Sequence, residues 1–280
     1  MITNDCIGKF MEKEWDCTFK DYILYALGVG ASEKELEYIY EKNLKVIPTI
    51  ATLPYNLSLE DNPYLAYVSD RSGILHASNE LKLYHPLPEK GGKLKYRQTL
   101  IAAHDMGEKG AQFVSQSDLF DEEGTLLASS IDTEFSRFDG GWGGPARPAD
   151  TFPRIPEREA DLVVTDHIAK GQSYLYRLSG DYYPLHADPE YAKSYGFKEP
   201  ILHGLCTYGY ICRMAIGALI PGEPERLTGM KGRFKNPVYT GIPISLHLWK
   251  AEEPGKAYYR LMDDSTGKIV VDRGELCWKA

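Results

Sequence analysis

An aspartate and a histidine five residues apart, Asp181 and His186, are the side chains of this sequence best placed to do chemistry. A turn between them would let both point into one pocket, where they could work as an acid/base pair. Gly204 follows and opens a long apolar segment. A helix that begins there would expose backbone N–H groups at the positive end of its dipole, and such groups stabilise a developing oxyanion. The three residues predict a site for proton transfer beside a polarised carbonyl group.

The same residues allow simpler interpretations. An Asp/His pair is often structural, because the carboxylate can fix one tautomer of a buried histidine. His203, at the start of the apolar segment, is interpreted as a packing residue, with a second base or a metal ligand as the alternatives. These side chains and Asp188 together have no familiar metal-ligand spacing, so no metal is expected.

Two helices are predicted around the candidate site. Residues 202–220 are apolar nearly all round, which is typical of a helix buried against a sheet. Asp188 followed by Pro189 marks a helix start, because aspartate caps free N–H groups and proline fits the first turn. Ser32, with acidic residues after it, indicates a similar start in the first part of the chain.

Segments that alternate apolar and polar residues between turn signals predict antiparallel strands. Asp181 itself is expected at the end of a further strand. The predicted strands cover residues 94–103, 112–119, 125–135, 245–251, 257–262 and 268–278.

An internal repeat divides the chain. Residues 25–30 (YALGVG) match 176–181 (YRLSGD), and Pro86 matches Pro237, both at an offset of 151. We therefore expect an N-terminal half at 1–138, a Gly/Pro-rich linker at 139–160 and a C-terminal half at 161–280. The residues opposite Asp181 and His186 are Gly30 and Glu35, so one site per chain is expected, with the first half serving as a scaffold or as a wall for the substrate.

Composition excludes several classes of protein. The formal net charge of −8 and the absence of long Lys/Arg runs argue against a nucleic-acid partner. The five cysteines are scattered and form no CxxC pair, so neither a disulfide framework nor a zinc site is indicated. The N-terminal residues carry charges throughout instead of a secretory signal, and no apolar run approaches the length of a membrane span.

The stretch SGDYYPLHADPEYAKSYGFKEPILHGLCTYG resembles the hydratase 2 motif of the MaoC-like family of (R)-specific 2-enoyl-CoA hydratases and dehydratases. The family motif reads S-G-D-x-N-P-L-H-x-D-P, followed by P-I-L-H-G-L. Further similarity covers most of the chain, including residues 84–88, 135–144 and 233–241. The resemblance implies an α+β double hot-dog fold, in which each half wraps an antiparallel sheet round a central helix.

The resemblance also implies a reaction, the reversible addition of water to trans-2-enoyl-CoA to give (3R)-3-hydroxyacyl-CoA. Asp181 and His186 would be the acid/base dyad, and Gly204 would donate its N–H to the thioester oxygen. No cofactor is implied, since coenzyme A is part of the substrate. A homodimer is implied, and the compartment would be the cytoplasm, or the peroxisome for a domain of a eukaryotic multifunctional enzyme.

An anionic coenzyme A needs local positive charge in a chain with a net charge of −8. Arg233 and Lys235, in a strand that resembles the family, are the best candidates for phosphate binding. The other candidates for substrate contact are Leu205, directly after Gly204, and the basic residues Lys198, Arg213 and Lys231.

One residue departs from the family motif. Tyr183 replaces the asparagine that belongs to the family's active site, and a long phenol cannot replace a short amide atom for atom. Either Tyr183 turns away and a neighbour substitutes for it, or its hydroxyl reaches the water or substrate from another angle, or the activity is altered. The alternatives to a hydratase are a non-catalytic acyl-CoA-binding or heteromer-forming protein and an acyl-CoA thioesterase.

Overall fold

Ten antiparallel strands form one continuous sheet in the computed structural model, which describes residues 2–57 and 59–280. All six strands predicted from the alternation of apolar and polar residues are present. The strands are β1 (Phe10–Thr18), β2 (Ile74–Leu83), β3 (Gly91–Asp105), β4 (Ala111–Phe120), β5 (Leu126–Ser136), β6 (Leu162–Ile168), β7 (Leu227–Phe234), β8 (Ile242–Lys250), β9 (Lys256–Asp263) and β10 (Lys268–Trp278).

The order of the strands confirms the internal repeat. The sheet runs β1-β3-β4-β5-β2 and then β7-β10-β9-β8-β6, so the second half repeats the first in reverse spatial order. The halves join through β2 and β7, which pair from Ser78 opposite Arg233 to Lys82 opposite Gly229. Two like units thus meet edge to edge and share one sheet.

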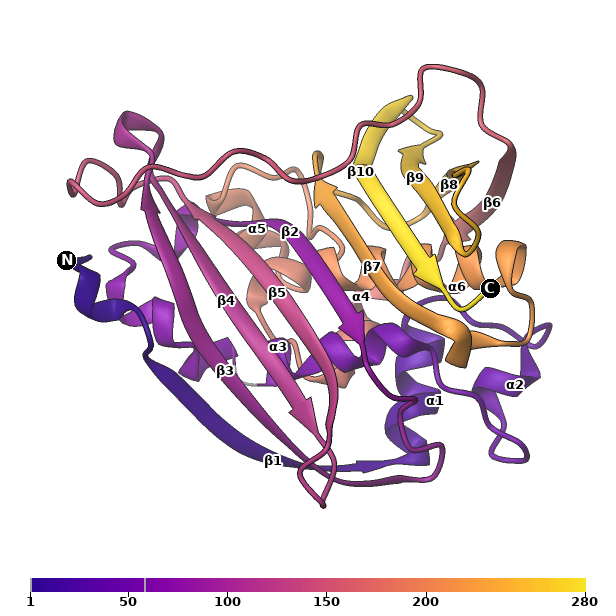
Figure 1. The fold of residues 1–280 in the computed structure, drawn as a ribbon. Coiled ribbons are helices and arrows are strands. Elements are labelled where there is room, and N and C mark those ends of the chain that lie inside the picture. Colours follow the sequence, from indigo (N-terminus) through magenta and orange to yellow (C-terminus); the bar gives the residue numbers. More distant parts are fainter. Residues whose placement is uncertain (1, 58) are drawn as a thin grey trace.

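Helices gather on one side of this curved sheet (Figure 1). They are α1 (Phe19–Gly28), α2 (Leu36–Ile39), α3 (Leu53–Leu57), α4 (Gln172–Tyr176), α5 (Pro189–Ser194) and α6 (Gly204–Leu219), with short 3₁₀ turns between them. The long helix α6 is buried from Leu205 to Ile216, as its almost wholly apolar sequence predicts. Asp188 caps α5 by accepting the N–H groups of Glu190 and Tyr191, which confirms the helix start predicted there.

The central helix of the first half is much shorter than that of the second. Leu53, which begins α3, lies 151 residues before Gly204, which begins α6, so the two helices occupy matching places in the repeat. However, α3 has 5 residues and α6 has 16. The architecture is the α+β double hot-dog fold, with unequal central helices.

Two local predictions were wrong. No helix begins at Ser32 itself: the short helix α2 begins at Leu36, directly after Glu35. A longer helix that was not predicted, α1, begins at Phe19, where the Thr18 N–H and hydroxyl both donate to the Asp21 carboxylate. The segment before Asp181 is helical instead of extended. There α4 packs on α1, and the Gln172 side chain donates to the carbonyls of Leu27 and Gly28 at the end of α1.

The segment between β5 and β6 crosses along the sheet from one half to the other (Figure 1). It forms an isolated bridge between Asp105 and Ala146, and Asp150 accepts hydrogen bonds from Arg233 and Arg273. This Gly/Pro-rich stretch is therefore held against the second half by ion pairs. No helix within the described ranges is long and apolar enough to cross a membrane.

Candidate active site

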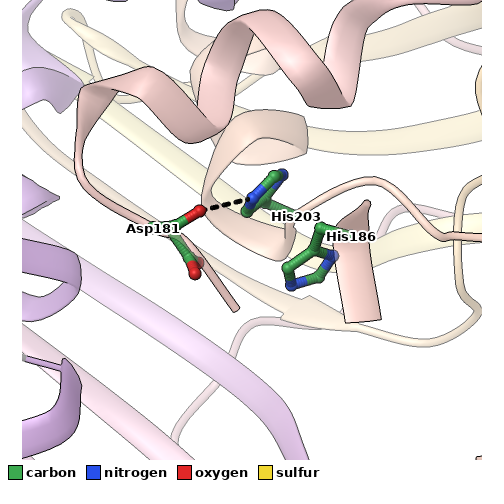
Figure 2. A group of neighbouring side chains, drawn as sticks. All are labelled: Asp181, His186 and His203. Atoms are coloured by element: carbon green, nitrogen blue, oxygen red, sulfur yellow. Dashed lines mark hydrogen bonds between the residues drawn. The ribbon is translucent and has the colours of Figure 1, made fainter. Parts of the chain in front are cut away.

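Asp181 and His186 lie together at the start of α6. Asp181 follows Gly180, whose φ of +128° turns the chain sharply, and His186 ends a 3₁₀ turn at Pro184–His186. One side-chain oxygen or nitrogen atom from each of Asp181, His186 and His203 lies within 4.8 Å of the other two, and all three residues are buried (Figure 2). The turn expected between the aspartate and the histidine is confirmed.

The surroundings of His186 fix its tautomer. Its Nδ1 lies 2.8 Å from the carbonyl oxygen of Ile201, which can only accept, so Nδ1 carries the proton. Burial lowers the pKa of His186 below its ordinary 6.5, although the Asp181 carboxylate and the Ile201 carbonyl oppose this shift. Neutral His186 therefore presents Nε2 as a hydrogen-bond acceptor.

Asp181 is a more basic carboxylate than an exposed aspartate. Burial raises its pKa, and this effect outweighs the opposing influence of His186 and of the Tyr183 N–H, which donates to Oδ1 over 3.1 Å. That N–H also fixes the orientation of the carboxylate. The two members of the dyad thus have pKa values shifted in opposite directions by the same dry environment.

His203 is a packing residue, as the sequence suggested. Its Nε2 donates to the backbone carbonyl of Asp181 over 3.2 Å, and its ring stacks on His186 with the centroids 3.8 Å apart (Figure 2). Burial lowers its pKa well below 6.5. Nitrogen lone pairs of two rings stacked nearly parallel do not converge on one point, so the trio is poorly arranged to chelate an ion.

Gly204 is the first residue of α6, and its N–H belongs to the first turn, which has no acceptor within the helix. A side chain here would lie 3.5 Å from both Nδ1 of His76 and the ring of Phe234. Leu205 is buried beside it. The glycine leaves an open space in front of the helix start.

A cavity of about 490 Å³ opens onto this space. It is walled by residues of both halves, including Tyr55, His76 and Glu134 from the first half and Asp181, His186, Gly204 and Leu205 from the second. The predicted catalytic residues are therefore brought together, and the first half forms the opposite wall.

The hydroxyl of Tyr183 is turned toward two other tyrosines. It lies 3.2 Å from the hydroxyl of Tyr191 and 3.1 Å from that of Tyr195. The Tyr183 ring meets His186 edge-on, with centroids 6.3 Å apart. A different amide is present in the cavity wall, because Asn56 is buried there and its Nδ2 has no hydrogen-bond partner among the described residues.

The predicted basic residues fall into two groups. Arg233 and Lys235 line the cavity, together with Arg137 and Arg147, which the sequence analysis did not select. Lys198 does not belong to that lining and lies over the ring of Tyr239, 4.3 Å from its centroid.

Arg213 and Lys231 bind carboxylates of the protein itself. Arg213 is buried and pairs with Glu35 and Asp166, and Lys231 pairs with Glu275. Phosphate binding by Arg213 is therefore excluded, because its guanidinium group is buried and already paired with two carboxylates.

Sequence reasoning missed the polar wall that faces the dyad. Ser130, Asp132, Glu134 and Ser136 alternate along β5 and are all buried, with Asp132 0% exposed. His76 stands opposite Glu134 in the pairing of β2 with β5. These polar residues occupy every second position in the sequence, but such a pattern is typical of the solvent-facing side of a strand.

Comparison with known proteins shows the family of this fold. Residues 15–138 match the family described as MFE-2 hydratase 2 N-terminal domain, and residues 151–271 match the MaoC like domain. A solved MaoC-like dehydratase from Phytophthora capsici superposes with a TM-score of 0.89 at 28% identity, covering 99% of this chain and 98% of that one.

Two relatives have similar lengths. The 3-hydroxyacyl-thioester dehydratase Y of Mycobacterium tuberculosis is 34% identical over 275 residues, which cover 93% of this chain and 92% of the relative. The peroxisomal enoyl-CoA hydratase 2 of Arabidopsis thaliana is 32% identical over 261 residues, or 86% and 84% of the two chains.

The fold and the paired Asp/His at the start of its central helix define a double hot-dog protein of the dehydratase type. The chain belongs to the MaoC-like dehydratase family, in the branch whose N-terminal half is of the MFE-2 hydratase 2 type.

Proposed function

We propose that this protein adds water reversibly to trans-2-enoyl-CoA and forms (3R)-3-hydroxyacyl-CoA. The observation that carries the proposal is the convergence of the Asp181 carboxyl group, the His186 side chain and the exposed N–H of Gly204 on one cavity. These are the base, the water-orienting group and the oxyanion donor that the reaction needs.

The dyad is suited to hold one water molecule. Ionised Asp181 and neutral His186 both accept, because Nδ1 of His186 is already committed to Ile201. A water between them donates both its hydrogens and directs an oxygen lone pair at C3 of the enoyl group. As the C3–O bond forms, the dyad takes one proton from the water and later returns it to C2.

The electrons of the double bond move onto the thioester oxygen during this step. The Gly204 N–H, at the positive end of the 16-residue helix α6, stabilises that charge. Protonation at C2 then restores the thioester. Substrate and product differ only by the atoms of one water molecule, so the dyad ends each cycle in its starting state.

Coenzyme A would enter where basic residues line the cavity. Lys235, Arg137 and Arg147 are exposed and form no ion pair within the described residues, so their charges remain available for phosphates. Arg233 also lines the cavity but shares Asp150 with Arg273. Leu205 would contact the acyl part near the thioester.

Incubation with crotonyl-CoA and longer enoyl-CoAs tests the proposal. Loss of enoyl absorbance without release of free thiol is the expected result. Release of thiol would indicate a thioesterase. No reaction at any chain length, with coenzyme A thioesters still bound, would indicate a binding protein and would contradict the proposal.

We expect kcat/KM for hydration to fall as the pH is lowered, because the water is held only while Asp181 and His186 are both unprotonated. Burial raises the pKa of Asp181 above its ordinary 3.8, so activity is present above this raised pKa and is lost as the pH falls through it. The acid limb should lie at higher pH than for an exposed aspartate. Rates between about pH 4 and about pH 8 measure it, and a rate that stays constant down to about pH 4 would contradict the assignment.

Replacing Tyr183 with phenylalanine is expected to lower kcat by no more than about threefold. The hydroxyl bonds to Tyr191 and Tyr195 instead of the dyad, so its loss removes partly buried hydrogen bonds worth about 1 kcal/mol each and no contact with the dyad. We assign the missing amide function to Asn56, which lines the cavity and whose buried Nδ2 has no hydrogen-bond partner among the described residues. Steady-state kinetics of Y183F and of Asn56→Leu give the comparison. A loss above tenfold in Y183F alone would show that the phenol takes part.

A further inference from the structure

A buried polar cluster in the first half faces the dyad of the second half. His76 is at its centre, and Nε2 of this residue lies 3.2 Å from Oδ1 of Asp132, 3.7 Å from Oε1 of Glu134 and 3.1 Å from the carbonyl oxygen of Ser78. Three acceptors surround one ring nitrogen. Nε2 therefore carries a proton that is directed into the cluster.

The cluster is rigidly built. Asn79 donates to Asp132 and Ser130 over 2.8 Å, and Tyr55 donates to Glu134 over 2.7 Å. The His76 ring stacks on Tyr55 and packs against Phe234, with centroids 5.7 and 4.8 Å apart. The ring is fixed on both faces and at one edge.

The other edge of the ring meets the start of α6. Nδ1 of His76 lies 3.5 Å from the position that a Cβ atom would take on Gly204. Within residues 2–57 and 59–280 this nitrogen has no hydrogen-bond partner. The His76 side chain is 16% exposed, whereas those of Asp132 and Glu134 are 0% and 3% exposed, so His76 is the most accessible of these three side chains.

The charge of the ring follows from its neighbours. Burial alone would lower the pKa of His76, but Glu134 and Asp132 outweigh burial and raise it to about 9. The other titratable groups near the ring are Tyr55 on α3, Asp181 across the cavity and Arg233 on β7, which is already bound to Asp150. At neutral pH both ring nitrogens are protonated, and Nδ1–H is a charged donor.

We propose that His76 is a second hydrogen-bond donor to the thioester oxygen and acts beside the Gly204 N–H, from the half of the chain that lacks the dyad. This inference rests on the proposed function. No proton is transferred: Nδ1–H stabilises the negative charge that develops on the oxygen, while Asp132 and Glu134 keep the ring protonated. A charged donor stabilises such an oxyanion more strongly than a neutral N–H.

The test replaces His76 with glutamine and measures hydration of crotonyl-CoA. We expect kcat to fall about 10²-fold, with KM changed less than about threefold, because the donor acts on charge that appears in the transition state. His247→Gln is the matched control, since His247 lies on β8 and bonds to Ser245 away from the cavity. It should keep the wild-type kcat.

The pH profile separates this role from a structural one. The wild type should lose activity as the pH rises through about 9, where His76 loses its proton. Asp132→Asn keeps His76 but removes a carboxylate, so its alkaline limb should move down by about 1 pH unit or more. This variant also serves if H76Q does not fold. An alkaline limb that stays in place would overturn the proposal.

A second measurement does not depend on turnover. Acetoacetyl-CoA forms an enolate that absorbs in the near ultraviolet and carries charge on the thioester oxygen. The wild type should bind this enolate at least about tenfold more tightly than H76Q. If the wild type hydrates no enoyl-CoA yet shows this difference, the proposed reaction fails while the donor role stands. Equal enolate binding, or a kcat of H76Q within twofold of wild type, would overturn the donor role.

Discussion

Replacing Asp181 with asparagine is expected to lower kcat/KM for enoyl-CoA hydration by about 10³-fold. An amide has no basic oxygen that can take a proton from water, although it keeps almost the shape of the carboxylate. The Oδ1 atom can still accept the Tyr183 N–H, so the turn should be retained. Decay of enoyl absorbance, measured under saturating and limiting substrate, gives the change.

A matched substitution controls for a general effect of removing an acid. Asp188 lies seven residues further on, where it caps α5 and does not line the cavity. Asparagine caps helices about as well as aspartate, so D188N should keep both activity and stability. D181N should unfold at the wild-type temperature or above it, because burial disfavours the charge that is removed. Wild-type activity in D181N would contradict the dyad.

Replacing Arg213 with methionine is expected to destabilise the fold by about 3 kcal/mol. The arginine side chain is 8% exposed and donates to Glu35 over 2.8 and 2.9 Å, to Val29 over 2.9 Å and to Asp166. Without it, two partly buried carboxylates face each other with no cation between them. The expected destabilisation lies at the lower end of the range for broken buried ion pairs, because the Glu35 and Asp166 side chains are each about a quarter exposed.

Thermal unfolding measures this effect, and a loss of about 5 °C is expected for a chain of this size. Arg226→Met is the control, since Arg226 pairs with Glu223 at the surface and such pairs contribute less than about 1 kcal/mol. Glu35 belongs to the first half, and Asp166 to the second. Similar unfolding temperatures for R213M and R226M would contradict the view that Arg213 ties the halves together.

Much of the fold could be predicted because its signals are local. Alternation of apolar and polar residues located six strands, and the continuous apolar stretch located α6. Asp188 and Pro189 fixed the start of α5 by their own side-chain geometry. The repeat at an offset of 151 predicted the two halves, because the chain contains the same folding unit twice.

Predictions failed where contacts with distant segments determine the local structure or the partner of a side chain. The helix α1 and the helical segment before Asp181 stabilise each other through Gln172, whose partners lie 144 and 145 residues away. Arg213 resembles a phosphate ligand in the sequence, yet its partner Glu35 lies 178 residues away. Tyr183 could not be oriented without knowing that α5 places Tyr191 and Tyr195 beside it.

The sequence by itself determined the local structure of the proposed dyad, because Asp181, His186 and Gly204 belong to one short motif whose turn and helix start are encoded locally. Only the tertiary structure decided what faces that pair. The pairing of β2 with β5 joins His76 to Glu134, and the pairing of β2 with β7 brings this first-half strand to the start of α6. Strand alternation gives the period of a strand but not which face is covered. The acids of β5 were therefore buried by the sheet as a whole, through contacts that no local pattern specifies.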